Sequence, residues 1–179
     1  MNTNEAIKFL EKQIQNPSIG LPEEIFLFIT RLTPMINVDL LIKDENGRIL
    51  LLWRDDAFHS ASWHVPGGII RFKEDIKTRI QKVAETEIGV EVQFEPVPLA
   101  INQIICDHSI RGHFISILHK CFLSSKYIPK NIGLSNKDSG YLKWHDSCPE
   151  NLIKVHEIYR KYLARPLAAT KFEIRISKY

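Results

Sequence analysis

Hydrophobic side chains repeat at helical spacing near the start of the chain. Residues 4–15 place Ile7, Leu10 and Ile14 on one face, which predicts a short amphipathic helix with Asn4 as its N-cap. The polar residues that follow include a proline and a glycine, and they end the pattern. We therefore expect a helical extension that precedes the main fold.

The next elements change from helical spacing to β-rich runs. A second helix is predicted at 22–32, because a proline followed by two glutamates suits a helix N-terminus. Residues 38–42 and 49–53 are rich in β-branched and aliphatic side chains and predict two strands. Asn46-Gly47 lies between them and indicates a hairpin, since both residue types tolerate a positive φ.

A longer helix is predicted in the middle of the chain, at residues 75–88. Gly89 follows it, where a left-handed C-terminal residue belongs. Its apolar face is formed by Ile76, Ile80, Val83, Ala84 and Ile88.

The remaining pattern predicts more strands and a closing helix. The strand candidates are 90–95, 97–105 and 112–123. A long polar loop at 124–140 precedes a final helix at 151–163, and the alternating residues 171–176 suit an added edge strand. Strands interrupted by one helix and closed by another indicate a mixed α+β domain.

The length of 179 residues is typical of one domain, which we place at 21–165. It would carry the helical extension at 1–20 and a tail at 166–179. A hydrophobic share of 44% and a charged share of 25% are ordinary for a globular protein, so neither disulfides nor a structural metal are needed for stability.

Composition excludes several functional classes. The cysteines, Cys106, Cys121 and Cys148, are odd in number and show no paired spacing, which predicts reduced thiols rather than disulfides or a zinc site. A net charge of +3 is too small to indicate nucleic-acid binding. The chain shows neither an apolar run long enough for a membrane span nor a secretory signal, so a cytoplasmic location is expected.

The residues with candidate chemistry begin at Gly67-Gly68, a turn that allows the backbone to approach a ligand closely. Glu74 follows six residues after the second glycine, and Glu87 lies in the last turn of the central helix. A carboxylate at Glu87 suits Mg²⁺, which prefers a few oxygen ligands. Glu74 is instead expected to form an ion pair with Lys82 as a structural brace.

This spacing resembles the signature of the Nudix hydrolase superfamily. The frame runs without a gap from Gly68 through Glu74 to the stretch 82–90, with Lys82 in place of the family's arginine and Glu87 as a retained metal-binding glutamate. The resemblance implies a Nudix-like α/β/α sandwich with a mixed sheet and a magnesium-dependent hydrolase.

Two other glutamates of the frame are Val83 and Thr86 here. The same loss is found in the GDP-mannose mannosyl hydrolase branch, which the chain resembles over most of residues 22 to 163 and which cleaves the sugar C–O bond. In that branch, the positions of Asp39, Arg54 and His113 carry an aspartate, an arginine that stabilises the departing diphosphate and a histidine. The resemblance therefore implies catalytic roles for all three residues.

The chain departs from this branch at two places. The branch's Gln-His pair falls on Asp138-Ser139, so Asp138 can replace an oxygen ligand, whereas Ser139 cannot replace the histidine base. A second arginine of the branch falls on Ile69, with Arg71 close by. The implied metal ligands are the Gly67 carbonyl, Glu87 and Asp138, and the implied substrate-binding residues are Arg54, Gly68 and Arg71.

The leading hypothesis is a hydrolase of a nucleotide sugar such as GDP-mannose. The alternatives are a pyrophosphohydrolase that cleaves a P–O bond and a non-catalytic nucleotide-binding domain. The resemblance also implies a homodimer and a small-molecule substrate, with neither nucleic acid nor membrane as a partner. The histidines considered as a replacement base are His64, His113, His119 and His145.

Overall fold

One mixed β-sheet organises the computed structural model, which describes residues 1–56, 59–164 and 173–178. The path order β3-β2-β1-β7-β6-β9 contains parallel pairs at β1–β7 and β6–β9, and its other neighbours are antiparallel. Strands β4, β5 and β8 pair at the sides of this path. The strands are β1 (Met35–Lys43), β2 (Ile49–Asp56), β3 (His59–His64), β4 (Gly67–Ile69), β5 (Gln93–Phe94), β6 (Ala100–Ile105), β7 (His113–Phe122), β8 (Leu142–His145) and β9 (Glu173–Lys178).

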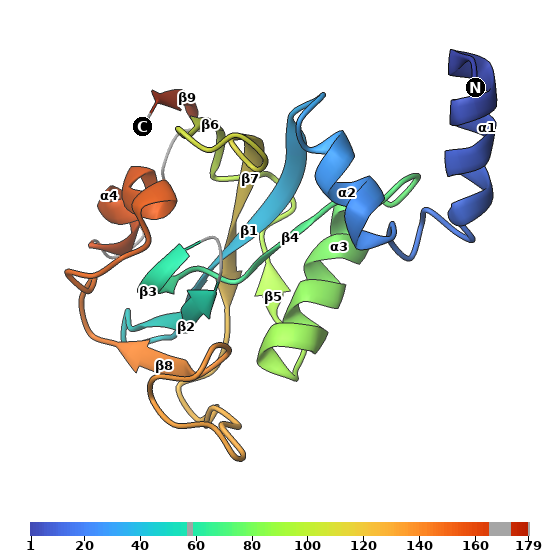
Figure 1. Ribbon diagram of the computed structural model, residues 1–179. Helices are drawn as coiled ribbons and strands as arrows, with labels where there is room; N and C mark the ends of the chain where they lie inside the picture. The colour runs from blue at the N-terminus through green and yellow to red at the C-terminus, as the bar shows by residue number, and fades with distance from the viewer. Residues whose placement is uncertain (57–58, 165–172, 179) are drawn as a thin grey trace.

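Helices cover both faces of this sheet (Figure 1). On one face, Ile80 and Val83 of α3 (Ile76–Val83) pack with Leu40 and other strand residues in a buried cluster. On the other face, Tyr159 and Tyr162 of the C-terminal helical segment form a second cluster. The predicted mixed α+β sandwich is therefore confirmed.

The predicted hairpin joins β1 to β2, with Lys43 opposite Ile49. Gly47 has a φ of 80°, as expected for its place in the turn. Asp44 organises this turn, because its carboxylate accepts hydrogen bonds from the backbone N–H groups of Asn46 at 3.0 Å and Arg48 at 2.8 Å.

The central helix differs from the prediction in its last turn. Asp75 caps α3 by accepting a hydrogen bond from the Thr78 N–H. After Val83, the chain continues as a π-helical turn, η1 (Ala84–Ile88), and Gly89 ends it with a φ of 78°. The wider turn changes how residues 84–88 face their surroundings, which a period of 3.6 residues does not anticipate.

The C-terminal elements are shorter than predicted. The expected helix at 151–163 is a 3-10 turn, η2 (Lys154–Tyr159), followed by the short α4 (Arg160–Leu163). The strand expected at 90–95 is reduced to two residues in β5. The tail does form an edge strand, β9, parallel to β6, although the first residues of the predicted stretch 171–176 lie outside the described part of the chain.

The N-terminal helix α1 (Thr3–Gln13) stands beside the sandwich rather than within it (Figure 1). Asn2, not Asn4, is its N-cap, because the Asn2 side chain accepts from the Glu5 N–H. None of its described side chains is buried, and Ile7 and Phe9 are exposed.

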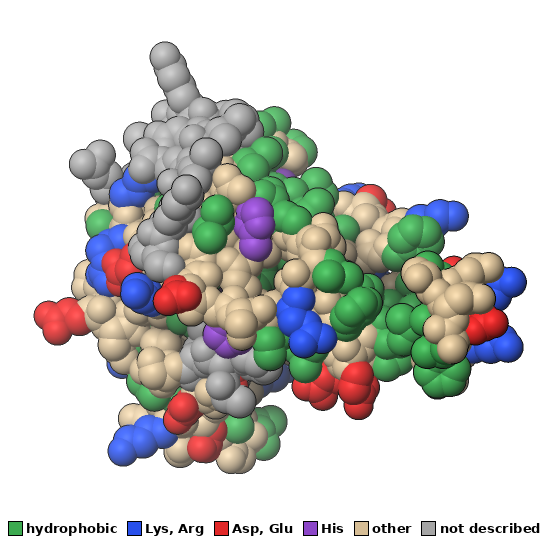
Figure 2. Space-filling model, turned by 45° about the horizontal axis from the view of Figure 1, so that its top comes forward, with side chains coloured by type: hydrophobic (Ala, Val, Ile, Leu, Met, Phe, Trp, Pro, Cys, Tyr) green, Lys and Arg blue, Asp and Glu red, His purple; other side chains and the backbone are tan. Residues whose placement is uncertain are grey.

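The second helix, α2 (Glu23–Ile29), begins after Pro22 as predicted but ends three residues early. It buries Ile25 and leaves Phe28 partly exposed. Figure 2 shows hydrophobic side chains among charged ones over the α1 and α2 side of the molecule. Within the described residues, no helix is both long and apolar enough to cross a bilayer.

Candidate functional site

A cavity of about 850 Å³ lies where the partners of β1 diverge. Strand β1 pairs with β2 at Lys43 and with β4 at residues 37–39, and all three strands line the cavity. Helix α2, the π-helical turn η1 and the segment at Val155-His156 complete its walls. The cavity therefore joins residues from both halves of the chain.

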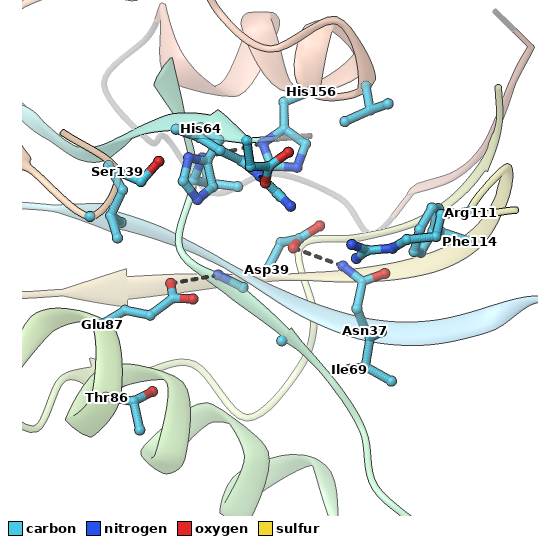
Figure 3. Close-up of a pocket in the computed structure, with 18 of the residues that line it drawn as sticks. Asn37, Asp39, His64, Ile69, Thr86, Glu87, Arg111, Phe114, Ser139 and His156 are labelled. Carbon is cyan, nitrogen blue, oxygen red and sulfur yellow. Dashed lines mark hydrogen bonds and ion pairs between the residues drawn. The ribbon is translucent and has the colours of Figure 1, made fainter. Parts of the chain in front are cut away.

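Glu87 and Asp39 meet at Gly67 in this cavity (Figure 3). The Gly67 N–H donates to the Glu87 Oε2 at 3.1 Å, and Gly67 is paired with Asp39 across β1 and β4. A Cβ on Gly67 would lie 2.2 Å from the Asp39 Oδ1, so any other residue here would displace that carboxylate. Glycine is required at this position because the backbone approaches a buried charge closely.

Asp39 is almost fully buried and is held by three hydrogen bonds. The Asn37 Nδ2 donates at 2.8 Å and the Ser116 Oγ at 2.5 Å, while the Tyr159 hydroxyl also donates to the Asp39 Oδ2. Burial raises the pKa of Asp39, and these hydrogen bonds oppose the rise. The network ties β1 and β7 to η2 at the base of the cavity.

Glu87 has a pKa raised to about 7, chiefly because burial disfavours its charged form. The hydrogen bond from Gly67 lowers this pKa, the charge of Asp39 raises it, and Arg54 lowers it. Two carboxylates that disfavour each other's ionisation form a place where a positive ion or a cationic ligand group is favourable.

Val83 and Thr86, which stand where the resembled signature has glutamates, have other roles in the structure. Val83 is buried in the core, and a Cβ on Gly68 would lie 2.8 Å from the Val83 Cγ2, so β4 packs directly on α3. Gly67 and Gly68 lie in this strand without a positive φ, so the predicted turn at these two residues is wrong. Thr86 lines the cavity, but its hydroxyl donates to the Lys82 carbonyl at 2.7 Å. Among positions 83, 86 and 87, Glu87 is thus the single carboxylate.

Glu74 acts as the structural brace that the sequence predicts. Its carboxylate forms the expected ion pair with Lys82 at 2.9 Å and a shorter one with Arg79 at 2.6 Å. It also accepts from the Arg71 N–H at 2.9 Å, which fixes the loop after β4 to α3.

The proposed substrate-binding arginines both line the cavity. Arg54 is half-buried and pairs with Asp56 at 2.5 Å. The Arg71 guanidinium lies against Gly20, since a Cβ there would be 2.5 Å from the Arg71 Nη1. Arg71 therefore reaches the cavity from its rim, beside the N-terminal segment.

Two predicted site residues are not brought to the cavity. The His113 ring bonds to the Gln103 Nε2 at 2.9 Å and is absent from the described residues that line the cavity. Asp138 is exposed and accepts from the Ser135 N–H at 2.6 Å within its own loop. Ser139 does line the cavity, with its hydroxyl bonded to both backbone groups of Asp55 at 2.8 Å. The separation arises because the loop turns Asp138 outward while its neighbour faces inward.

The structure places two histidines in the cavity wall, His64 and His156 (Figure 3). Their ring centroids are 6.2 Å apart. The sequence predicts His64 as one of four candidate bases, whereas it does not indicate His156, because nothing in the surrounding sequence distinguishes that residue from an ordinary helix residue. The other candidates, His119 and His145, do not appear among the described lining residues.

Arg111, Phe114 and Asn37 also line the cavity and were not predicted. Arg111 and Phe114 come from the loop before β7 and its first residues, which carry no motif. Their position beside β1 is a consequence of the parallel β1–β7 pairing.

These donors could hold a divalent cation only with a small number of protein ligands. The described residues contain no cluster of three or more His, Cys, Asp and Glu side chains that could hold a metal. Mg²⁺ commonly binds through one or two carboxylates and completes its shell with water and substrate phosphates. Glu87 and Asp39 beside Gly67 meet that lower requirement.

Solved structures with this fold are Nudix hydrolases. A MutT Nudix hydrolase from Burkholderia pseudomallei is 21% identical, with a TM-score of 0.56 over 72% of this chain and 97% of that chain. A Nudix hydrolase from Nitrosomonas europaea is 16% identical, with a TM-score of 0.54 over 82% and 80%. A MutT protein from Methanosarcina mazei is 21% identical, with a TM-score of 0.52 over 73% and 94%. The chain therefore has the Nudix hydrolase fold.

Comparison with curated proteins finds a partial relative. The low-salt glycan biosynthesis protein Agl8 of Haloferax volcanii is 32% identical over 83 residues, which is 46% of this chain and 53% of that protein. The chain thus spans about half the length of this relative. No profile of a known protein family matches the chain.

Proposed function

We propose that this protein, which has the Nudix hydrolase fold, hydrolyses a nucleotide sugar and releases the sugar and a nucleoside diphosphate. The observation that carries the proposal is the meeting of Glu87 and Asp39 at Gly67, in a cavity that also contains Arg54. Carboxylates for a cation and an arginine for phosphate oxygens are the groups that a diphosphate ester requires.

Two observations favour cleavage at the sugar rather than at phosphorus. The apolar Val83 and the bonded Thr86 hydroxyl leave Glu87 as the single carboxylate of these box positions, which disfavours a site with several metals. The relative Agl8 is named for glycan biosynthesis, a process that uses activated sugars. Both support a nucleotide sugar such as GDP-mannose as the substrate.

In this reaction, water attacks the anomeric carbon, the bond from that carbon to the diphosphate oxygen breaks, and the nucleoside diphosphate leaves. Glu87 and Asp39 would hold magnesium, which would supply positive charge to the diphosphate. Arg54 stabilises the same leaving group from β2, because a guanidinium donates to phosphate oxygens in pairs.

A base must take the proton of the attacking water, and we propose His64 for this role. The Nδ1 of His156 accepts from the Val65 N–H at 3.2 Å, which places the proton of a neutral His156 ring on Nε2. A neutral His156 ring is therefore a donor at Nε2 and not a proton acceptor there. His64, beside it on β3, is the histidine positioned to accept the proton from water.

Product analysis tests the proposed function. The protein is incubated with GDP-mannose, other nucleotide sugars and ADP-ribose, with and without Mg²⁺. Free sugar and nucleoside diphosphate are expected, while nucleoside monophosphate and sugar phosphate would show P–O cleavage instead. Thermal stabilisation by a nucleotide sugar without any turnover would show that the protein is a binding domain rather than an enzyme.

Two variants test the assigned residues. Glu87→Gln should abolish the dependence of turnover on Mg²⁺, and unchanged activity in this variant would exclude Glu87 as the essential ligand. His64→Ala should lose most of kcat while the thermal stabilisation by GDP-mannose is retained, and added imidazole should restore part of the rate. His113→Ala is the matched control, because that ring bonds to Gln103 rather than facing the cavity.

A further inference from the structure

Two arginines from distant parts of the chain face the same cavity. Arg54 comes from β2 and Arg111 from the loop between β6 and β7, and both line the cavity. The Arg111 guanidinium stacks over the Phe26 ring of α2, 5.7 Å from the ring centroid. Figure 3 shows the Arg111 side chain pointing inward, toward Asn37.

An acidic residue accompanies this pair. Asp56 also lines the cavity, and its carboxylate bonds to the Arg54 Nε at 2.5 Å. Burial lowers the pKa of Arg111, the charge of Arg54 lowers it further, and the charge of Asp56 raises it. All three side chains line one cavity, so the charges of Arg54 and Asp56 both act on Arg111.

We infer that Arg54 and Arg111 form a two-arginine clamp for the diphosphate of the substrate, and that Asp56 is the counterion that the diphosphate displaces. The inference rests on the proposed function, because it assigns how the same cavity binds its nucleoside diphosphate. Asp56 is exposed, so it can turn to solvent when phosphate oxygens take its place.

A diphosphate suits this arrangement better than a smaller anion. Each guanidinium presents a planar set of donors that fits two oxygens of a phosphate. Two such groups match the two phosphates, while Glu87 and Asp39 occupy another part of the cavity wall around Gly67.

The stacking on Phe26 explains how Arg111 is held in place. A cation above an aromatic face is attracted by the ring, and the contact leaves the donors at the guanidinium edge directed outward. Arg111 is half-buried, which strengthens its interaction with an anion relative to an exposed side chain.

Binding measurements with GDP and guanosine test the clamp. In calorimetric titrations with Mg²⁺ present, Arg111→Gln should weaken GDP binding by about tenfold to a hundredfold and leave guanosine binding unchanged. Asp56→Asn should bind GDP several-fold more tightly than the unmodified protein, because the competing carboxylate is gone.

Matched controls separate charge from packing. Arg31→Gln removes an arginine that stacks on Phe28 of α2, 5.9 Å from the ring centroid and outside the described cavity lining, and should leave GDP binding unchanged. Asp55→Asn is the control for Asp56→Asn. It removes the neighbouring carboxylate and retains the hydrogen bonds between the Asp55 backbone and Ser139. Arg111→Lys keeps the positive charge and should bind GDP with intermediate affinity.

Equal losses for GDP and guanosine in Arg111→Gln would overturn the clamp and make Arg111 a packing residue. Weaker GDP binding in Asp56→Asn would overturn the counterion role, since that residue would then support the site. These are binding results, so they are independent of turnover. If the protein binds GDP as expected but hydrolyses no nucleotide sugar, the clamp is supported and the proposed function is wrong.

Discussion

At the scale of single residues, burial decides what the site carboxylates can do. Asp39 is held by Asn37, Ser116 and Tyr159, whereas Glu87 accepts a hydrogen bond from the Gly67 N–H. Both side chains have raised pKa values because burial disfavours their charge. Carboxylates whose charge is made unfavourable by burial are more typical of functional sites than of stabilising contacts.

The stability of the metal-free protein should therefore improve in Glu87→Gln at neutral and alkaline pH. The folded protein binds more protons than the unfolded chain between the usual Glu87 pKa of 4.5 and its raised value of about 7. Its free energy of unfolding falls as pH rises through this window, and the full penalty is present above it. We expect a gain of about 2 kcal/mol at pH ~8 and none at pH ~4, measured by urea unfolding.

Glu85→Gln is the matched control for this measurement. Glu85 is exposed on the same π-helical turn, so its substitution should not reproduce the pH-dependent gain. A Glu87→Gln variant that is less stable at high pH would contradict the burial of an unfavourable charge.

At the scale of elements, α3 and the turn η1 keep the spacing of the signature that the sequence resembles but not its charges. Glu74 binds Arg79 and Lys82 of the helix, so the loop and the helix keep their relative positions. Val83 faces the core and Thr86 faces the cavity. A glutamate should therefore be tolerated more readily at position 86 than at position 83.

Thr86→Glu should strengthen divalent-cation binding. Its side chain is exposed at the cavity, so an added carboxylate costs little burial and lies near Glu87. We expect about tenfold tighter binding of Mn²⁺ or Mg²⁺ by isothermal titration calorimetry, because a further oxygen ligand becomes available.

Val83→Glu provides the contrast. It would place a charge in the core beside Gly68 and should destabilise the fold by several kcal/mol. Unchanged cation affinity in a well-folded Thr86→Glu variant would show that position 86 does not face the cation.

At the scale of the whole molecule, the sandwich makes the cavity and α1 stands outside it (Figure 1). The cavity lining begins at Leu21 and reaches His156, so it depends on segments from most of the chain. Helix α1 contributes neither a buried side chain nor a lining residue among those described.

Removal of residues 1–15 should therefore leave both stability and GDP binding nearly unchanged. We expect the thermal midpoint to shift by less than about 2 °C, because a change below ~0.5 kcal/mol is typical when no buried contact is lost. Removal of residues 1–29 is the control and should unfold the protein or abolish binding, since it deletes the buried Ile25 and the cavity residue Phe26. A large loss in the shorter deletion would mean that α1 has a partner, such as a second copy of the chain.

Local patterns predicted much of the fold and part of the site. The hairpin at Gly47, the start of the central helix and its end at Gly89 follow from backbone preferences of a few neighbouring residues. The brace at Glu74 follows from fixed spacing along a loop and a helix. The π-helical turn and the short C-terminal helices were missed, because packing and not propensity sets their geometry.

The sequence by itself determined the position of Glu87 in the central helical segment and the absence of carboxylates at Val83 and Thr86. Only the tertiary structure decided that Arg54 and Arg111 share a cavity, and that His64 lies beside His156 while His113 does not. The physical reason is that spacing constrains residues within one loop or helix. Contacts across the sheet instead depend on strand order and register, which also bury Glu87 and raise its pKa.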